Sequence, residues 1–156
     1  MKIHLLVTGK TNQKYIQLGL DDFCNRLSHY FPFKMEIIPE INNTKNLSIE
    51  QLKDKEGKLI LKHIQSGDYI VLLDERGKEF TSVNFADYIE KKTFTNVKRL
   101  VFVIGGAYGF SNEVYETANE KIALSKMTFS HQMVRLIFVE QLYRAMTILG
   151  NEPYHH

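Results

Sequence analysis

Short apolar runs alternate along the chain with longer segments whose apolar residues recur at helical spacing. A short continuous apolar run favours a strand, whereas apolar residues gathered on one helical face favour an amphipathic helix. The pattern predicts strands over residues 2–7, 34–40, 68–75, 99–106 and 121–124. It predicts helices over residues 14–29, 48–64, 82–91 and 131–149, with a short helix after Ser111.

Two of the expected strands, "DYIVLLDE" (68–75) and "RLVFVIGG" (99–106), show no alternation of apolar and polar residues. Such strands are typical of a parallel sheet that helices cover on both faces. Because strands and helices alternate along the whole chain, we expect a single α/β domain over residues 1–156 with a mainly parallel sheet.

Several expected helices carry start signals. The tetrapeptide "SIEQ" at residues 48–51 fits a capping box, in which a serine and a glutamine satisfy each other's backbone amides. Ser82 and Ser111 are expected to cap the next two helices, and Ser130 is a candidate cap for the longest one.

Composition changes this picture little. With 156 residues, 44% of them hydrophobic, the chain can bury the core of one ordinary domain. The net charge of +2 is small for a nucleic-acid-binding protein, so an RNA partner would require the basic side chains to be concentrated at a site. The single cysteine, Cys24, is expected to be a buried small hydrophobe in a reducing compartment. No apolar run is long enough to span a membrane, and we expect a cytoplasmic protein.

Candidate chemistry gathers after the buried strands. The segment "IGGAYGFS" (104–111) follows one of them, at the edge of an α/β sheet where ligands bind. The alternative is a tight turn with no ligand. The charged segment "LLDERGKEF" (72–80) follows the other strand, and it is either a solvated turn or the rim of the same pocket.

The segment "LSKMTFSHQMVR" (124–135) combines small, polar and basic residues before the longest helix. His131 and Arg135 are four residues apart and share a helix face, so together they could contact a phosphate. Alternatively, His131 serves only the helix start. The segment "VTGKT" (7–11) lacks the first glycine of a nucleotide-binding P-loop.

Two other classes of site are not expected. His155 and His156 are adjacent and have no cysteine or carboxylate cluster at metal-ligand spacing, so we expect no metal. No G-x-S-x-G motif is present, so a hydrolase with that nucleophile is not expected either.

The segments "LDERGKEFTS", "FVIGGAYGFS", "LSKMTFSHQMVRLIFVEQLYRA" and the terminal "PYHH" occur in this order. Together they resemble the small bacterial methyltransferases of the SPOUT class that modify N3 of a pseudouridine in 23S, large-subunit, ribosomal RNA. The resemblance covers essentially the whole chain.

The resemblance implies a C-terminal trefoil knot and a homodimer with each active site near the subunit interface. It implies that S-adenosylmethionine is the methyl donor and that ribosomal RNA, in the assembled ribosome, is the partner, with no DNA, membrane or metal. Carried over by position, the contacts of the methyl donor would be Leu73, Gly105, Leu124, Ser125, Lys126, Met127, Thr128 and Phe129.

The mechanism implied is direct methyl transfer. N3 of a neutral pseudouridine carries a proton, and the resemblance makes Tyr154 and His155 the candidates to accept it. Arg135, with His131, would contact RNA phosphate or the developing negative charge.

The chain departs from the family pattern at Tyr108, where an acidic or small polar residue is common, and at His156, where Arg or Lys is common. Two alternatives to the enzyme remain open at this point. One is a non-catalytic RNA- or ribosome-binding factor with a vestigial cofactor pocket, and the other is a nucleotide-binding protein that uses the glycine segment.

Overall fold

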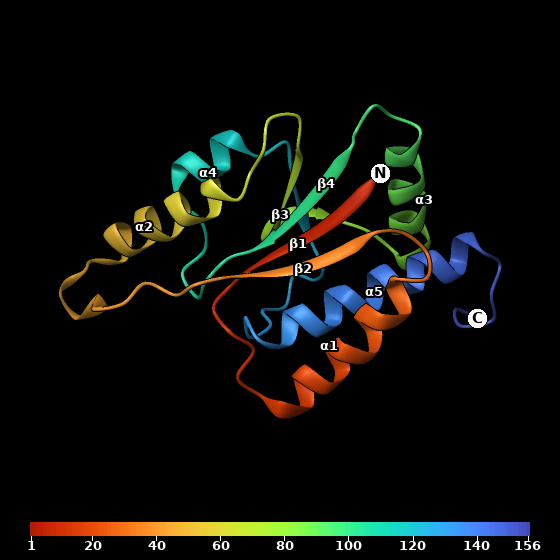
Figure 1. Ribbon diagram of the computed structural model, residues 1–156, viewed down its shortest axis with the longest axis horizontal. Coiled ribbons are helices and arrows are strands. Elements are labelled where there is room, and N and C mark those ends of the chain that lie inside the picture. The colour runs from red at the N-terminus through yellow and green to blue at the C-terminus, as the bar shows by residue number, and fades with distance from the viewer.

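The computed structural model describes residues 1–156 and contains a five-stranded sheet with helices on both faces (Figure 1). The strands lie in the order β2-β1-β4-β3-β5, and every neighbouring pair is parallel, as expected. Their bounds are β1 (Lys2–Thr8), β2 (Phe33–Ile38), β3 (Tyr69–Glu79), β4 (Arg99–Ile104) and β5 (Glu120–Ala123). The helices are α1 (Lys14–Leu27), α2 (Ile49–Lys62), α3 (Ser82–Thr93), α4 (Asn112–Thr117) and α5 (Met133–Leu149), with a 3₁₀ turn at Thr44–Asn46.

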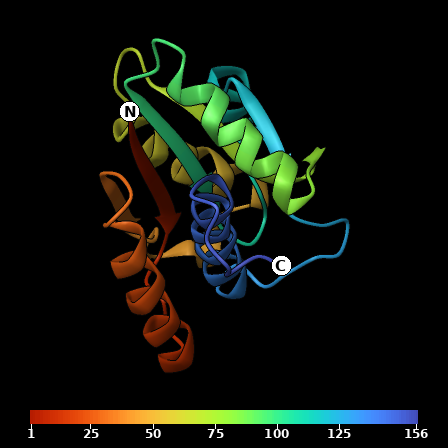
Figure 2. The same ribbon diagram turned by 90° about the vertical axis from the view of Figure 1, so that its right-hand side faces the viewer.

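The sheet divides two apolar cores. Helices α1, α3 and α5 pack on one face, and α2 and α4 cover the other (Figures 1 and 2). Strand β4 shows why its sequence has no alternation: Leu100, Phe102 and Ile104 enter the first core, while Val101 and Val103 enter the second. The expected α/β domain is confirmed, and the trefoil knot stays a prediction.

Local capping chemistry decides where the helices begin. Ser48 and Gln51 form the expected capping box, and Ser111 caps α4. The cap of α3, however, is Thr81 and not Ser82. Thr81 has an extended backbone and accepts a hydrogen bond from the amide of Asn84, whereas the Ser82 hydroxyl donates to Gln141 of α5.

The start of α5 differs from the prediction by two residues, because a turn precedes the helix at Met133. Ser130 still accepts from the Met133 amide, over 3.1 Å. In that turn, Gln132 donates to the Lys10 carbonyl and accepts from the Asn12 amide, so the β1–α1 loop is tied to the start of α5.

Strand β3 does not end at Glu75 as expected but resumes and runs to Glu79. Its pairing with β5 jumps, since Leu73 and then Lys78 both pair with Ile122, and residues 74–77 leave the sheet between them as a bulge. The bulge returns over β5 at Gly77, where an added Cβ would lie 2.5 Å from backbone atoms of Ile122. Only glycine permits so close an approach of two backbones.

None of the helices combines the length and the apolar character needed to cross a membrane.

Candidate active site

A cavity of about 540 Å³ opens at the carboxyl ends of β3, β4 and β5. That volume is within the usual range for small-molecule sites, roughly 300–1,000 Å³. Three segments surround it: the β3 bulge, the glycine loop after β4, and the loop between β5 and α5. The three segments that the sequence singled out therefore meet at one place.

The predicted cofactor residues all line this cavity except Lys126. Its side chain is 88% exposed, and the ammonium lies 3.9 Å from the Glu79 carboxylate. The structure thus brings the remaining residues together, although their contacts with a cofactor stay a prediction. Tyr108, 56% exposed, also lines the cavity, as does His131.

The glycine loop folds back tightly over the ring of Phe110, which is buried. A Cβ on Gly105 would lie 2.9 Å from that ring, and Gly109 has a φ of +85°, in the left-handed region. The tight-turn interpretation and the ligand-site interpretation are therefore compatible, since the turn itself shapes one wall of the cavity.

Asp74 organises the wall formed by the bulge. Its carboxylate accepts hydrogen bonds from the Arg76 amide, over 2.8 Å, and from the Tyr115 hydroxyl. Burial alone would raise the pKa of Asp74, but these hydrogen bonds outweigh burial and lower it. Burial and the bond to Asp74 raise the pKa of Tyr115. The carboxylate is therefore ionised and the phenol neutral near neutral pH.

Arg76 completes this wall. Its Nη2 donates to the Tyr115 hydroxyl over 2.7 Å, and its guanidinium lies 5.2 Å from the Tyr115 ring centroid. The charged segment 72–80, singled out in the sequence, contains Asp74 and Arg76, but no sequence pattern indicated Tyr115. It lies on α4, four residues after the Ser111 cap, and no local pattern indicates that its hydroxyl reaches a strand 41 positions earlier.

Comparison with known proteins agrees with this arrangement. A family model described as "Predicted SPOUT methyltransferase" matches residues 1–155. The chain belongs to the SPOUT methyltransferase family. It is 66% identical to the ribosomal RNA large subunit methyltransferase H of Parabacteroides distasonis, over 100% of this chain and 99% of that protein. With the same coverage, it is 63% identical to the methyltransferase H of Phocaeicola vulgatus and 61% identical to that of Bacteroides thetaiotaomicron.

The C-terminal tail of this SPOUT methyltransferase does not line the cavity. Instead it packs along α5: the Tyr154 hydroxyl donates to Glu140 over 2.9 Å, and the Tyr154 ring lies 4.7 Å from the Arg144 guanidinium. His155 Nδ1 lies 3.2 Å from Nη1 of Arg144, and Nη2 of Arg144 donates to Glu140 over 2.6 Å. Figure 1 shows the C-terminus beside the end of α5, whereas His131 and Val134 line the cavity at its start.

These contacts set the protonation of the tail. Arginine can only donate, so His155 must accept at Nδ1 and, when neutral, carries its proton on Nε2. Burial raises the pKa of Tyr154, and its hydrogen bond to Glu140 adds to the effect. In this arrangement Tyr154 is a poor proton acceptor, and Nδ1 of His155 is occupied by its contact with Arg144.

Arg135 requires a correction, because its side chain is fully buried and does not line the cavity. It donates to the carbonyls of Thr8, Gly9 and His131 and to the Thr11 hydroxyl, at distances of 2.7 to 3.2 Å. The expected contact with RNA phosphate is thus replaced by a clamp that fixes the β1–α1 loop against α5. His131 and Arg135 do not share a surface, since His131 lies in the turn before the helix.

Two further residue groups can be placed. Cys24 is partly buried in the first core, and burial raises the pKa of its thiol to about 11, which suits a packing role. No group of three or more His, Cys, Asp or Glu residues is arranged to hold a metal ion.

Proposed function

We propose that the protein transfers the methyl group of S-adenosylmethionine to N3 of a pseudouridine in the 23S ribosomal RNA of the assembled ribosome. The observation that carries the proposal is the cavity at the carboxyl edge of the sheet, where three segments converge in a member of the SPOUT methyltransferase family. The names of the relatives given above, ribosomal RNA large subunit methyltransferase H, support the choice of substrate.

The cavity suits the methyl donor in size and chemistry. Leu73, Met127 and Phe129 offer apolar surface, and the glycine loop lets a ligand approach backbone amides and carbonyls. Bound S-adenosylmethionine supplies an already activated methyl group. The residues of the protein therefore need only hold the two reactants in line and exclude water.

The proton on N3 requires an acceptor, and we assign that role to His155. Tyr154 is less suited, because burial and the bond to Glu140 hold its phenol neutral. Within one chain the tail packs on α5 and away from the cavity lining. We therefore propose a homodimer in which the tail of one copy completes the cavity of the other.

The decisive experiment incubates ribosomes with isotopically labelled S-adenosylmethionine and analyses the ribosomal RNA by mass spectrometry. We expect one labelled methyl group per ribosome, on a pseudouridine of the large-subunit RNA. His155→Ala should lower kcat by about 10²- to 10⁴-fold, the usual contribution of a general base, without changing the affinity for S-adenosylmethionine. The matched control is His29→Ala, an exposed histidine after α1.

Two results would contradict the proposal. His155→Ala with wild-type activity at every pH would remove this residue from the mechanism. Calorimetry without binding at millimolar S-adenosylmethionine would favour the non-catalytic RNA-binding alternative.

The shared site can be tested separately. Co-expression of His155→Ala chains with Gly105→Phe chains should restore activity to the mixed dimers, since one of their two sites combines an intact cavity with an intact tail. A lack of restoration in isolated mixed dimers would show that tail and cavity act within one chain.

The small net charge bears on the form of the substrate. With a charge of +2, the protein gains little general affinity for RNA phosphates, so we expect recognition of the folded ribosome surface. Protein-free fragments of the RNA should be methylated much more slowly than ribosomes, and equal rates would refute this expectation.

A further inference from the structure

A second cleft, also of about 540 Å³, adjoins the cavity on the side of α2 and α4. It shares Arg76 and Tyr115 with the cavity, so the two openings meet at this pair. The residues that line it are Lys53, Arg76, Asn112, Tyr115, Ala118, Asn119, Glu120 and Lys121. Six of these eight are polar or charged, which argues against an apolar ligand.

Three cations reach this cleft from three different elements: Lys53 of α2, Arg76 of the β3 bulge and Lys121 of β5. The ring of Tyr115 lies near two of them, with the Arg76 guanidinium at 5.2 Å and the Lys121 ammonium at 5.5 Å from its centroid. Lys121 forms no ion pair. Lys53 lies 3.6 Å from an oxygen of Glu50, whose side chain is 77% exposed.

Asp74 balances the charge of Arg76, but neither Lys53 nor Lys121 has a carboxylate partner among the residues that line the cleft. Glu120 is its one carboxylate, and it already accepts from the Lys92 ammonium, over 2.9 Å, and from the Tyr69 hydroxyl. Asn119 accepts from the Ile70 amide through Oδ1, so its NH₂ group points away from that bond and can donate.

We propose that this cleft binds a backbone phosphate of the RNA substrate, beside the nucleotide that enters the cavity. Lysine, arginine and amide N–H groups are the usual protein donors to RNA and DNA phosphates. The inference rests on the proposed function, because it assigns part of the RNA to a surface that continues from the cavity.

The test uses Lys53→Gln, Lys121→Gln and the double variant. Lys55→Gln is the matched control, since Lys55 is an exposed lysine of α2 that does not line the cleft. Binding to a fluorescent fragment of large-subunit ribosomal RNA is measured by anisotropy over a range of KCl concentrations. Calorimetry with S-adenosylmethionine should give the wild-type affinity for every variant, which shows that each is folded with an intact cavity.

We expect the double variant to bind the fragment about 10-fold more weakly near 0.1 M salt. The slope of log K against log salt should become shallower by about 0.7–0.9 for each lysine removed, because fewer counterions are released. On ribosomes, KM should rise by a similar factor while kcat stays within about twofold of wild type. Lys55→Gln should match the wild-type protein in each assay.

An unchanged affinity and salt slope in the double variant would overturn the proposal. Weaker activity on ribosomes with unchanged binding to protein-free RNA would overturn it too, in favour of a contact with a ribosomal protein. The binding assay requires no methyl transfer. If the wild-type protein failed to methylate ribosomes while the salt slope still depended on both lysines, the proposed function would fail and the phosphate site would stand.

Discussion

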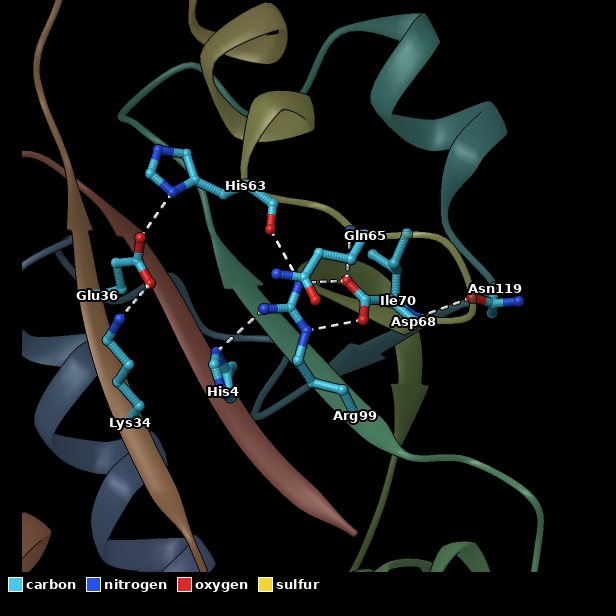
Figure 3. Close-up of polar contacts among 9 residues, drawn as sticks. All are labelled: His4, Lys34, Glu36, His63, Gln65, Asp68, Ile70, Arg99 and Asn119. Atoms are coloured by element: carbon cyan, nitrogen blue, oxygen red, sulfur yellow. Dashed lines mark hydrogen bonds and ion pairs between the residues drawn. The ribbon is translucent and has the colours of Figure 1, made fainter.

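Two arginine–aspartate pairs lie at opposite ends of the sheet and differ in almost every contact. At the amino end, Arg99 donates to both carboxylate oxygens of Asp68, and these side chains are only 14% and 3% exposed (Figure 3). At the carboxyl end, Arg76 lies 3.4 Å from Asp74, and the Arg76 side chain is 71% exposed. The same two residue types therefore form a buried, doubly hydrogen-bonded pair at the amino end and a pair with an exposed arginine at the carboxyl end.

The partners of each pair explain the difference. Arg99 also donates to the His63 carbonyl, and Asp68 accepts from the Gln65 amide, so the pair joins the end of α2 to the starts of β3 and β4 (Figure 3). Arg76 keeps its Nη1 free of any hydrogen bond, at the boundary of the cavity and the cleft. A buried, saturated pair fixes the fold, whereas Arg76, exposed and unsaturated beside an Asp74 side chain that is only 9% exposed, can meet a ligand.

The largest effect is expected at the amino end. Arg99→Ala should lower the free energy of unfolding by about 3–5 kcal/mol, because it leaves the Asp68 carboxylate buried without its partner. Urea denaturation followed by circular dichroism measures this loss. Arg99→Lys, which keeps the charge, should unfold at an intermediate urea concentration. A loss of less than about 1 kcal/mol for Arg99→Ala would show that the Arg99–Asp68 pair is not a stabilising contact.

Arg135 extends the comparison, since its side chain is buried and hydrogen-bonded although it lies at the carboxyl end of the sheet, as Arg76 does. Arg135→Ala should cost about 2–4 kcal/mol, because the carbonyls of Thr8 and Gly9 lose their donor in a buried place. Urea denaturation measures this loss of free energy of unfolding as well. Arg135→Lys, with fewer donors, should recover only part of the stability. Full stability together with a large loss of RNA affinity in Arg135→Ala would instead place this residue at the substrate.

Arg76→Ala should show the reverse behaviour. We expect an almost unchanged urea midpoint, because the Arg76 side chain is exposed and Asp74 keeps its hydrogen bonds from the backbone amide of residue 76 and the Tyr115 hydroxyl. We expect kcat/KM for ribosomes to fall about 10-fold, the effect of losing one charge-assisted hydrogen bond. A large shift of the urea midpoint with unchanged kinetics would show that the two pairs have the same role.

The smallest effect concerns pH. Because the folded-state pKa of Asp74 is depressed, its ionised carboxylate stabilises the fold above the unfolded-state pKa, about 3.9, and this contribution disappears as pH falls through the lower folded value. The difference in urea midpoint between the wild-type protein and Asp74→Asn should be constant from pH 8 to 5 and shrink below about pH 4. A difference that persists to pH 2 would contradict this assignment.

Local chemistry in the sequence predicted the parallel sheet, the cap at Ser111 and the meeting of three segments at one edge. It misplaced features that depend on distant partners. The continuation of β3 to Glu79 depends on Ile122 of β5, and helical spacing placed Arg135 on a surface although the β1–α1 loop covers it. Tyr115 was missed for the same reason, because its hydroxyl finds Asp74 only in the folded chain.

The close approach of Gly77 to Ile122 makes β5 a reporter on the cavity. Strand β5 lies at the edge of the sheet and is paired only with β3, and its last two residues, Ile122 and Ala123, pair with Lys78 and Glu79 directly after the bulge. We therefore expect a molecule that holds Leu73 to Arg76 rigid to slow hydrogen–deuterium exchange at Ile122 and Ala123 as well. Exchange rates on this short strand would therefore detect a bound ligand without any label on the ligand and without turnover.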